Sequence, residues 1–248
     1  MPHIEIAAEK LGTFLSLPIT NTLVHSWLAV ILLILLARTL SRNIDIVPGS
    51  VQNLFEMILG VFMNLMEGVL GTKEKAEKYL PLVFTIFLFV LVSNWLGIFP
   101  GVGTIGLKKT GGGETLIIPF LRSAASDLNF TLALGVSAVI FINLIGAAAI
   151  GIGKHVGRFI SFKGPIEFFI GILELISEGA KMISFSFRLF GNILAGEVLL
   201  VIIAFLVPFI APLPFLALEI FVGFIQALVF SMLTMVFISI ATAEHGGH

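Results

Sequence analysis

The feature that most constrains this chain is a set of long apolar blocks, each bounded by proline, glycine or charge. The blocks cover residues 24–36, 82–99, 130–152, 168–207 and 215–240. A helix needs about 20 apolar residues to cross a hydrocarbon core about 30 Å thick. Continued to residue 40, the first block reaches about 17 residues, the lower limit for a span. The blocks therefore predict a multi-pass helical membrane protein.

Composition agrees with this class and excludes several others. The 248 residues are 58% hydrophobic and 12% charged, which is about half the charged fraction of an ordinary soluble domain. The absence of cysteine excludes disulfides and thiolate chemistry. A net charge of −1 and five scattered histidines predict no nucleic-acid partner, no metal and no cofactor. A G-x-G-x-x-G pattern at 101–106 follows an apolar block and not a soluble strand, so we do not interpret it as a nucleotide site.

The distribution of cations predicts the orientation. Glu5, Glu9 and Lys10 precede the first block while Arg38 and Arg42 follow it, the pattern of an anchor with its N-terminus outside. One side of the membrane then receives eight cations and the other four, namely Lys10, Lys108, Lys109 and Arg122. The cation-rich side holds Arg38, Arg42, Lys73, Lys75, Lys78, Lys154, Arg158 and Lys163. We therefore expect that side and the C-terminus to be cytoplasmic.

Two segments need separate treatment. Residues 48–70 alternate apolar and polar side chains at helical spacing, which predicts an amphipathic helix at the cytoplasmic interface.

Residues 167–207 contain no proline, and about 40 helical residues measure about 60 Å, twice the hydrocarbon thickness. A single strongly tilted helix accommodates that length. Pro208, Pro212 and Pro214 then reverse the chain into a last helix that ends at residue 241.

The expected fold class is an all-α integral membrane protein with about five membrane helices and one interfacial helix. The last two helices form a long tilted hairpin that follows three steeper spans. We expect one membrane domain over 1–248, with an outer segment 1–23, spans 24–40, 82–99 and 128–152, the interfacial helix 48–70, and a hairpin of 167–207 and 213–241.

Function is expected where charge lies within the membrane, because a central Arg or Lys costs about 3 kcal/mol on insertion scales. At 100° per residue, five polar residues of the tilted helix fall within about 80° of one another. They are Glu174, Glu178, Lys181, Arg188 and Asn192. Glu178 and Lys181 are spaced to form an i,i+3 ion pair, whereas Arg188 has no acidic residue three or four positions away.

The face around Arg188 suggests what compensates it. Ser184, Gly191 and Ala195 share that face and are small, so another helix could approach closely. A partner helix that carries a carboxylate would explain both the small residues and the unpaired cation. The alternatives are that Arg188 reaches an interface or is permanently paired within the chain.

A second set of polar residues lies on the hairpin. Glu197 projects about 180° away from Arg188, and Glu219 and Gln226 lie on one face of the last helix, where they could meet either Glu197 or Arg188. Carboxyl groups in such a place suit reversible proton uptake, or serve as structural hydrogen-bonding groups. Asp127, Asn129 and Asn94 could line an aqueous entrance, or act as a helix cap and interfacial polar residues.

Two motifs carry a family resemblance. The stretch F-R-L-F-G-N-I-L-A-G-E at 187–197, followed by Gln226, and the stretch S-D-L-N-F-T-L at 126–132 resemble subunit a of the F-type ATP synthase membrane sector. The resemblance extends over nearly the whole chain from the first span. It implies that Arg188 is the family's essential arginine, facing a ring of c subunits that each carry one carboxylate. It also implies that Glu197, Glu219, Gln226 and Asn192 serve proton translocation.

One departure from the family pattern stands out. Many relatives place a histidine at one of the positions held here by Glu197 and Glu219. Two facing acids could instead share a proton or bind a water.

The resemblance implies a non-catalytic stator subunit that passes protons through two offset half-channels, in a bacterial inner membrane. The half-channels would be lined by Asn94, Asp127, Asn129, Glu174, Glu178 and Lys181. Expected partners are the c-subunit ring, the peripheral-stalk b subunits, the rest of the ATP synthase and the lipid bilayer. A self-contained secondary transporter is less favoured because no internal repeat is visible. An intramembrane hydrolase using Glu174, Glu178 or His155 would need a metal-ligand pair such as H-E-x-x-H, which is absent.

Overall fold

The computed structural model describes residues 8–14, 17–42, 44–99, 102, 105–111, 114–159, 164–208 and 210–243. Within them, six helices are long and apolar enough to cross a membrane, which confirms the all-α membrane class. These are α1 (Asn21–Arg42), α2 (Ser50–Leu70), α3 (Lys73–Ile98), α4 (Leu128–Ile150), α6 (Pro165–Leu206) and α7 (Pro212–Thr242). His245 and His248 of the C-terminal tail lie outside the described residues, as do Gly101, Gly103 and Thr104 of the G-x-G-x-x-G stretch.

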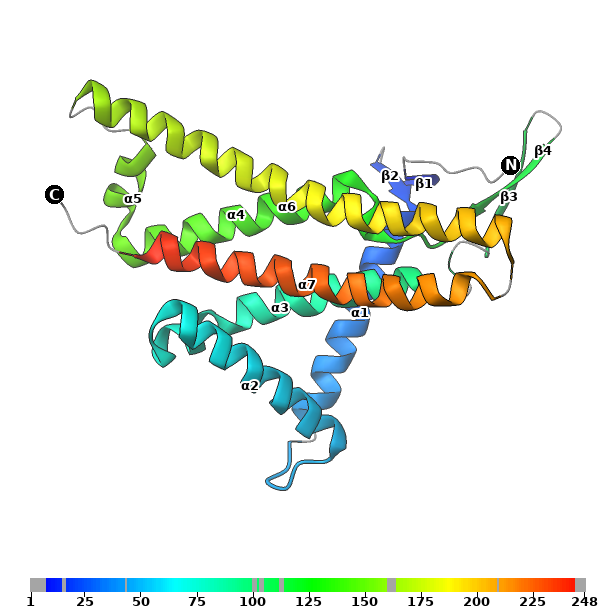
Figure 1. Cartoon of the computed structure of the whole chain (residues 1–248), viewed down its shortest axis with the longest axis horizontal. Coiled ribbons are helices and arrows are strands. Elements are labelled where there is room, and N and C mark those ends of the chain that lie inside the picture. The colour runs from blue at the N-terminus through cyan, green and yellow to red at the C-terminus, as the bar shows by residue number, and fades with distance from the viewer. Residues whose placement is uncertain are drawn as a thin grey trace.

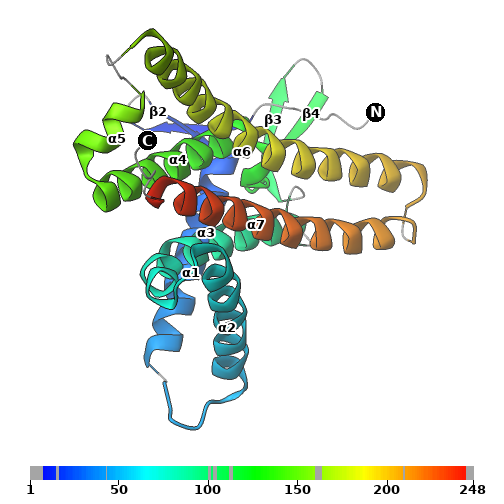
Figure 2. The same ribbon diagram turned by 60° about the vertical axis from the view of Figure 1, so that its left-hand side comes forward.

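The helices form two groups (Figures 1 and 2). α3, α4, α6 and α7 run alongside one another, while α1 crosses them at a steep angle and α2 returns from its far end toward the start of α3. α3 and α4 therefore follow the direction of the hairpin. We expected the first three spans to be steeper than the hairpin. α1 does run in a different direction from the hairpin, but α3 and α4 do not, so the expectation is wrong for α3 and α4. The physical reason is lateral packing, because α3 lies along α7 and α4 along α6.

The long hairpin has the form that its sequence predicts. α6 is one uninterrupted helix of 42 residues, with Pro165 at its first turn, where proline's missing N–H costs nothing. α7 likewise begins with Pro212 at its N-terminus. The prolines lie at the helix ends because an interior proline would break the hydrogen-bond ladder.

α2 occupies the segment expected to be interfacial. Phe62, Met66 and Leu70 on one face are buried, while Leu54 and Val61 are exposed. Its 21 residues are long and apolar enough to make α2 a candidate span by length and composition. Its interfacial placement therefore remains a proposal.

The core lies between α2 and the four helices that run alongside one another. Val83 and Phe87 of α3, Ile142 of α4, Leu189 of α6 and Ile238 of α7 belong to one buried apolar cluster. Gly135 lets α4 and α6 approach closely, since a side-chain carbon there would lie 2.5 Å from Ser186 Oγ. The bundle is thus fixed by small residues at the crossings and by aromatic and branched residues between them.

Four elements were not predicted from the sequence. Two are the antiparallel hairpins β1 (Lys10–Phe14) with β2 (Leu17–Thr20) and β3 (Gly106–Gly111) with β4 (Glu114–Pro119). The others are the 3₁₀ turn η1 (Ala124–Ser126) and the short helix α5 (Ile152–Phe159). Each strand of the hairpins, the 3₁₀ turn and α5 has eight residues or fewer, which is too short to give a clear periodic pattern in the sequence. In Figure 1, β3 and β4 lie toward the turn of the α6–α7 hairpin, and α5 lies at the opposite end.

Candidate functional site

Polar side chains inside the bundle gather in two places. We call the first the α5 network; it consists of Asn143, His155, Arg158, Glu174, Glu178 and Lys181. We call the second the loop cluster; it consists of His25, Asn94, Arg122, Asp127, Glu197 and Glu219, around the segment that carries η1. Arg188 lies on α6 between Lys181 and Glu197 and belongs to neither.

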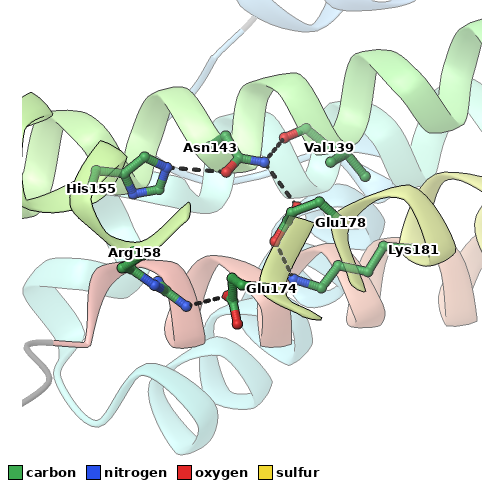
Figure 3. A network of polar contacts seen from close by, with 7 residues as sticks. All are labelled: Val139, Asn143, His155, Arg158, Glu174, Glu178 and Lys181. Atoms are coloured by element: carbon green, nitrogen blue, oxygen red, sulfur yellow. Dashed lines mark hydrogen bonds and ion pairs between the residues drawn. The ribbon is translucent and has the colours of Figure 1, made fainter. Parts of the chain in front are cut away.

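The α5 network connects three helices (Figure 3). The Asn143 amide of α4 donates to Glu178 Oε2 at 2.9 Å and to the Val139 carbonyl at 2.9 Å. His155 Nε2 of α5 lies 3.1 Å from Asn143 Oδ1. Because the amide nitrogen of Asn143 already donates twice, its oxygen is the acceptor, and His155 carries its proton on Nε2. The network therefore selects one tautomer of His155.

Both carboxylates of this network have cationic partners. Lys181 Nζ pairs with Glu178 Oε1 at 2.5 Å, which confirms the predicted i,i+3 pair. Arg158 Nη2 of α5 pairs with Glu174 Oε1 at 2.6 Å. Lys181 also lies over the Phe237 ring of α7, 4.9 Å from its centroid. The charges predicted to form one stripe with Arg188 are thus neutralised at their own end of α6.

His155 is nearly buried, at 5% exposure. Burial lowers the pKa of its imidazole below the ordinary value, and the Arg158 guanidinium lowers it further. Glu178 and Glu174 act in the opposite direction but do not reverse the shift. His155 is therefore neutral at physiological pH.

Arg188 is exposed on the outside of the bundle. Its only hydrogen bond in the described part of the chain is a long one, 3.5 Å from Nη2 to Ser184 Oγ, and no carboxylate of the described residues pairs with it. The surrounding small and polar residues, Ser184, Gly191, Asn192 and Ala195, are exposed as well. A neighbouring face of α6 is buried through Phe185, Leu189 and Ile193. The predicted small-residue face is hence an open surface of this chain.

Glu197 has a partner that the sequence did not indicate. Arg122, from the segment just before η1, lies with Nε 3.3 Å from Glu197 Oε1. The Arg122 side chain is 8% exposed and that of Glu197 is 33% exposed. The ion pair joins α6 to the segment that carries η1.

Glu219 of α7 lies beside the turn of α6 that carries Gly196 and Glu197. It is 8% exposed, and a side-chain carbon added at Gly196 would lie 3.1 Å from its Oε1. The sequence left open whether Glu219 meets Glu197 or Arg188. The contact with Gly196, the residue before Glu197, favours Glu197. Gln226, two turns further along α7, is half-buried.

The end of α3 closes the cluster against α7. Asn94 is buried, and its amide donates to the Gly223 carbonyl at 3.0 Å, while its Oδ1 has no partner among the described residues. Trp95 Nε1 donates to the Ile220 carbonyl at 3.1 Å. These bonds hold α3 against the turn of α7 that carries Glu219.

Asp127 caps the N-terminus of α4, which is one of the two roles expected for it. Its Oδ1 accepts from the Asn129 backbone N–H at 2.9 Å, and from the Asn129 amide, at the first turn of α4. Its Oδ2 accepts from Thr22 Oγ1 at 2.8 Å. His25 of α1 is fully buried, and its Nδ1 accepts from the Ala124 N–H at 3.3 Å. Asp127 and His25 therefore tie the η1 segment to the start of α1.

Several site residues were missed from the sequence. Arg122 was counted only as a loop cation, and His155 was considered only as a hydrolase candidate. Asn143 lies in an apolar block. A single amide side chain within a span indicates a hydrogen bond to another helix, so the sequence did carry a signal for Asn143. Arg158 carries no local signal, because its partner Glu174 lies on another helix.

The fold and these sites define a class: a multi-pass helical membrane protein that holds ionisable residues between its helices. The chain matches the family model of the ATP synthase A chain over residues 23–239. It is 34% identical to ATP synthase subunit a of Campylobacter jejuni over 90% of this chain and 91% of the relative. It is 36% identical to ATP synthase subunit a 3 of Pelobacter propionicus, over 86% and 84% respectively. The chain belongs to the ATP synthase subunit a family.

Proposed function

We propose that this chain is the proton-conducting stator subunit of a rotary F-type ATP synthase. Family membership makes it a non-catalytic component of that complex. In the proposal, protons pass through two offset half-channels, one open to each side of the membrane, by way of carboxylates on a ring of c subunits. Arg188 separates the two half-channels.

The observation that carries this proposal is the exposed Arg188 on its face of small residues. An arginine without a carboxylate partner among the described residues is costly in a membrane unless a partner or water compensates it. Ser184, Gly191 and Ala195 leave room for a helix backbone to approach. A ring carboxylate that passes this face would be stabilised in its ionised form, and a direct proton leak would be blocked.

The remaining polar residues supply the two half-channels. Glu197, Glu219, Gln226 and Asn192 would carry or orient the proton, with Asn94, Asp127 and Asn129 lining the way from outside. Glu174, Glu178 and Lys181 would line the side of α5. With N-terminus outside and C-terminus cytoplasmic in a bacterial inner membrane, α5 and its cations Lys154 and Arg158 lie on the cytoplasmic side. The c ring, the b subunits, the rest of the synthase and lipid would be the partners.

The test is proton-driven ATP synthesis by the whole complex in vesicles. Arg188→Ala should reduce synthesis by about a hundredfold or more, the usual cost of removing one preorganised charge partner. Arg188→Lys should rescue poorly, because an ammonium lacks the planar fork of the guanidinium. Arg38→Ala, at an exposed arginine of α1, is the matched control and should synthesise normally. Near-normal synthesis by Arg188→Ala would refute the proposal.

A further inference from the structure

We propose that Arg122 is a positioning residue that holds Glu197 ionised, so that Glu219 alone carries the proton in the loop cluster. This inference rests on the proposed function and assigns different roles to two acids that the sequence makes look equivalent. It also brings into the site a residue that lies 75 positions before Glu197 in the chain.

The first step is the ion pair itself. Arg122 Nε lies 3.3 Å from Glu197 Oε1, and only 8% of the arginine side chain is exposed. A cation that cannot deprotonate, held this close and largely out of water, favours the charged form of its partner. Protonation of Glu197 would leave the guanidinium beside a neutral acid, which is unfavourable for a buried charge.

The second step is that the position of Arg122 is built into the fold. The Phe120 N–H donates to the Ile105 carbonyl at 3.0 Å on one side of Arg122. On the other side, His25 accepts from the Ala124 N–H, and Thr22 donates to Asp127. The segment is thus tied to α1 and to the β3–β4 hairpin, and it presents the guanidinium to α6 from a fixed place.

The third step concerns Glu219. It is 8% exposed, no ion pair involves it within the described ranges, and its Oε2 has no hydrogen-bond partner there. A carboxyl group in such surroundings can exist as the neutral acid, because burial disfavours an uncompensated charge. Glu219 can therefore take one proton from water on the outer side and give that proton to a ring carboxylate. It returns to its ionised form, while Glu197 keeps a constant charge.

A charge-pair series in the assembled synthase tests this assignment. The variants are Arg122→Gln, Arg122→Lys, Glu197→Gln, the double variant Arg122→Gln with Glu197→Gln, and Glu219→Gln. Proton-driven ATP synthesis is measured across outer pH and normalised to the amount of assembled complex. Normalisation removes any effect of the ion pair on folding alone.

Each single substitution removes one member of a charge pair that lies largely out of water, so ATP synthesis by Arg122→Gln and by Glu197→Gln should each fall at least about tenfold. The double variant should recover at least about threefold over either single, and Arg122→Lys should keep most of the wild-type rate. Glu219→Gln should be the most severe. In Arg122→Gln two acids titrate together, so the pH profile should broaden from one step to two, and the double variant should restore one step.

A double variant no better than Glu197→Gln would overturn the inference, because Glu197 would then itself pass protons. Equal normalised rates and pH profiles in all the Arg122 variants would also overturn it, since the pair would then be structural only. Including Arg188→Ala in the same series separates a failure of the role given to Arg122 from a failure of the proposed function. If Arg188→Ala abolishes synthesis, a failed charge-pair series refutes only the role of Arg122; if it does not, the proposed function itself fails.

Discussion

His155 Nε2 of α5 lies 3.1 Å from Asn143 Oδ1 of α4, so the imidazole donates to the one acceptor atom of the Asn143 side chain. The amide nitrogen of Asn143 donates to Glu178 on α6. One short helix therefore organises a hydrogen-bond chain across two long ones. The Arg158 to Glu174 pair adds a second attachment of α5 to α6.

The first prediction is that acid loosens α5. Because the pKa of His155 is lowered in the folded protein, the undocked form binds more protons once the pH falls below the ordinary value of 6.5. Docking is therefore at full strength above about pH 7.5 and weakens as the pH falls through 6.5 and below. Hydrogen exchange of residues 152–159, corrected for the intrinsic effect of pH, should show less protection at pH 5 than at pH 7.5.

His155→Gln is the matched variant for that experiment. Its amide can still donate to Asn143 but does not titrate, so its exchange should lose most of the dependence on pH. Equal protection at both pH values in the wild type would contradict the role given to His155.

The second prediction concerns the open face of α6. A side-chain carbon at Gly191 meets nothing within 4 Å, so Gly191→Leu should leave the chain folded. Gly191 lies on the Arg188 face, so the added side chain should hold off a ring helix and reduce ATP synthesis by about tenfold or more. Gly179→Leu is the control, because a side-chain carbon at Gly179 also meets nothing within 4 Å, but Gly179 projects about 180° away from Arg188 on the same helix. Similar rates in the two variants would count against the assigned face.

A crosslinking experiment checks the same face without a bulky substitution. Cysteine at the exposed Ala195 should crosslink to cysteine on a ring helix, whereas cysteine at the buried Ile193 should not. Equal yields at 193 and 195 would mean that α6 meets the ring through a different face.

The third prediction compares two ion pairs of different exposure. Glu178→Ala leaves Lys181, whose side chain is 20% exposed, without its carboxylate, and should cost about 3 kcal/mol of stability. Glu77→Ala breaks the Lys73 pair, whose side chains are 69% and 57% exposed, and should cost about 0.5 kcal/mol or less. Thermal or denaturant unfolding in detergent measures both. A cost for Glu77→Ala that equals or exceeds that for Glu178→Ala would show that the α5 network does not stabilise the bundle.

The fourth prediction tests the contact between α6 and Glu219. Alanine at Gly196 would place a carbon 3.1 Å from Glu219 Oε1, so the carboxyl group must shift by a few tenths of an ångström. We expect proton-driven synthesis to fall about three- to tenfold with assembly intact, because small misplacements of a reacting group are costly. Gly179→Ala, whose added carbon meets nothing within 4 Å and lies away from the Arg188 face, should be close to wild type. Unchanged synthesis in Gly196→Ala would show that Glu219 does not need this position.

The sequence alone was sufficient for features with a local physical cause. Apolar length determined which segments are helical and could span a membrane, and proline determined where α6 and α7 begin. The i,i+3 spacing predicted the Glu178 to Lys181 pair, because both residues lie on one helix whose geometry is known in advance. The small residues around Arg188 were visible for the same reason.

Only the tertiary structure decided which residues from different segments meet. Arg122 and Glu197, Asn143 and Glu178, and Asn94 and Gly223 are joined across loops whose course no local pattern encodes. The inclination of α3 and α4 was likewise decided by their packing along α7 and α6. The physical reason is that helical periodicity specifies a face of each helix, while the partner of that face depends on how all the helices pack together. The asymmetry between Glu197 and Glu219 is a property of that packing, since it requires a guanidinium delivered from a distant segment of the chain.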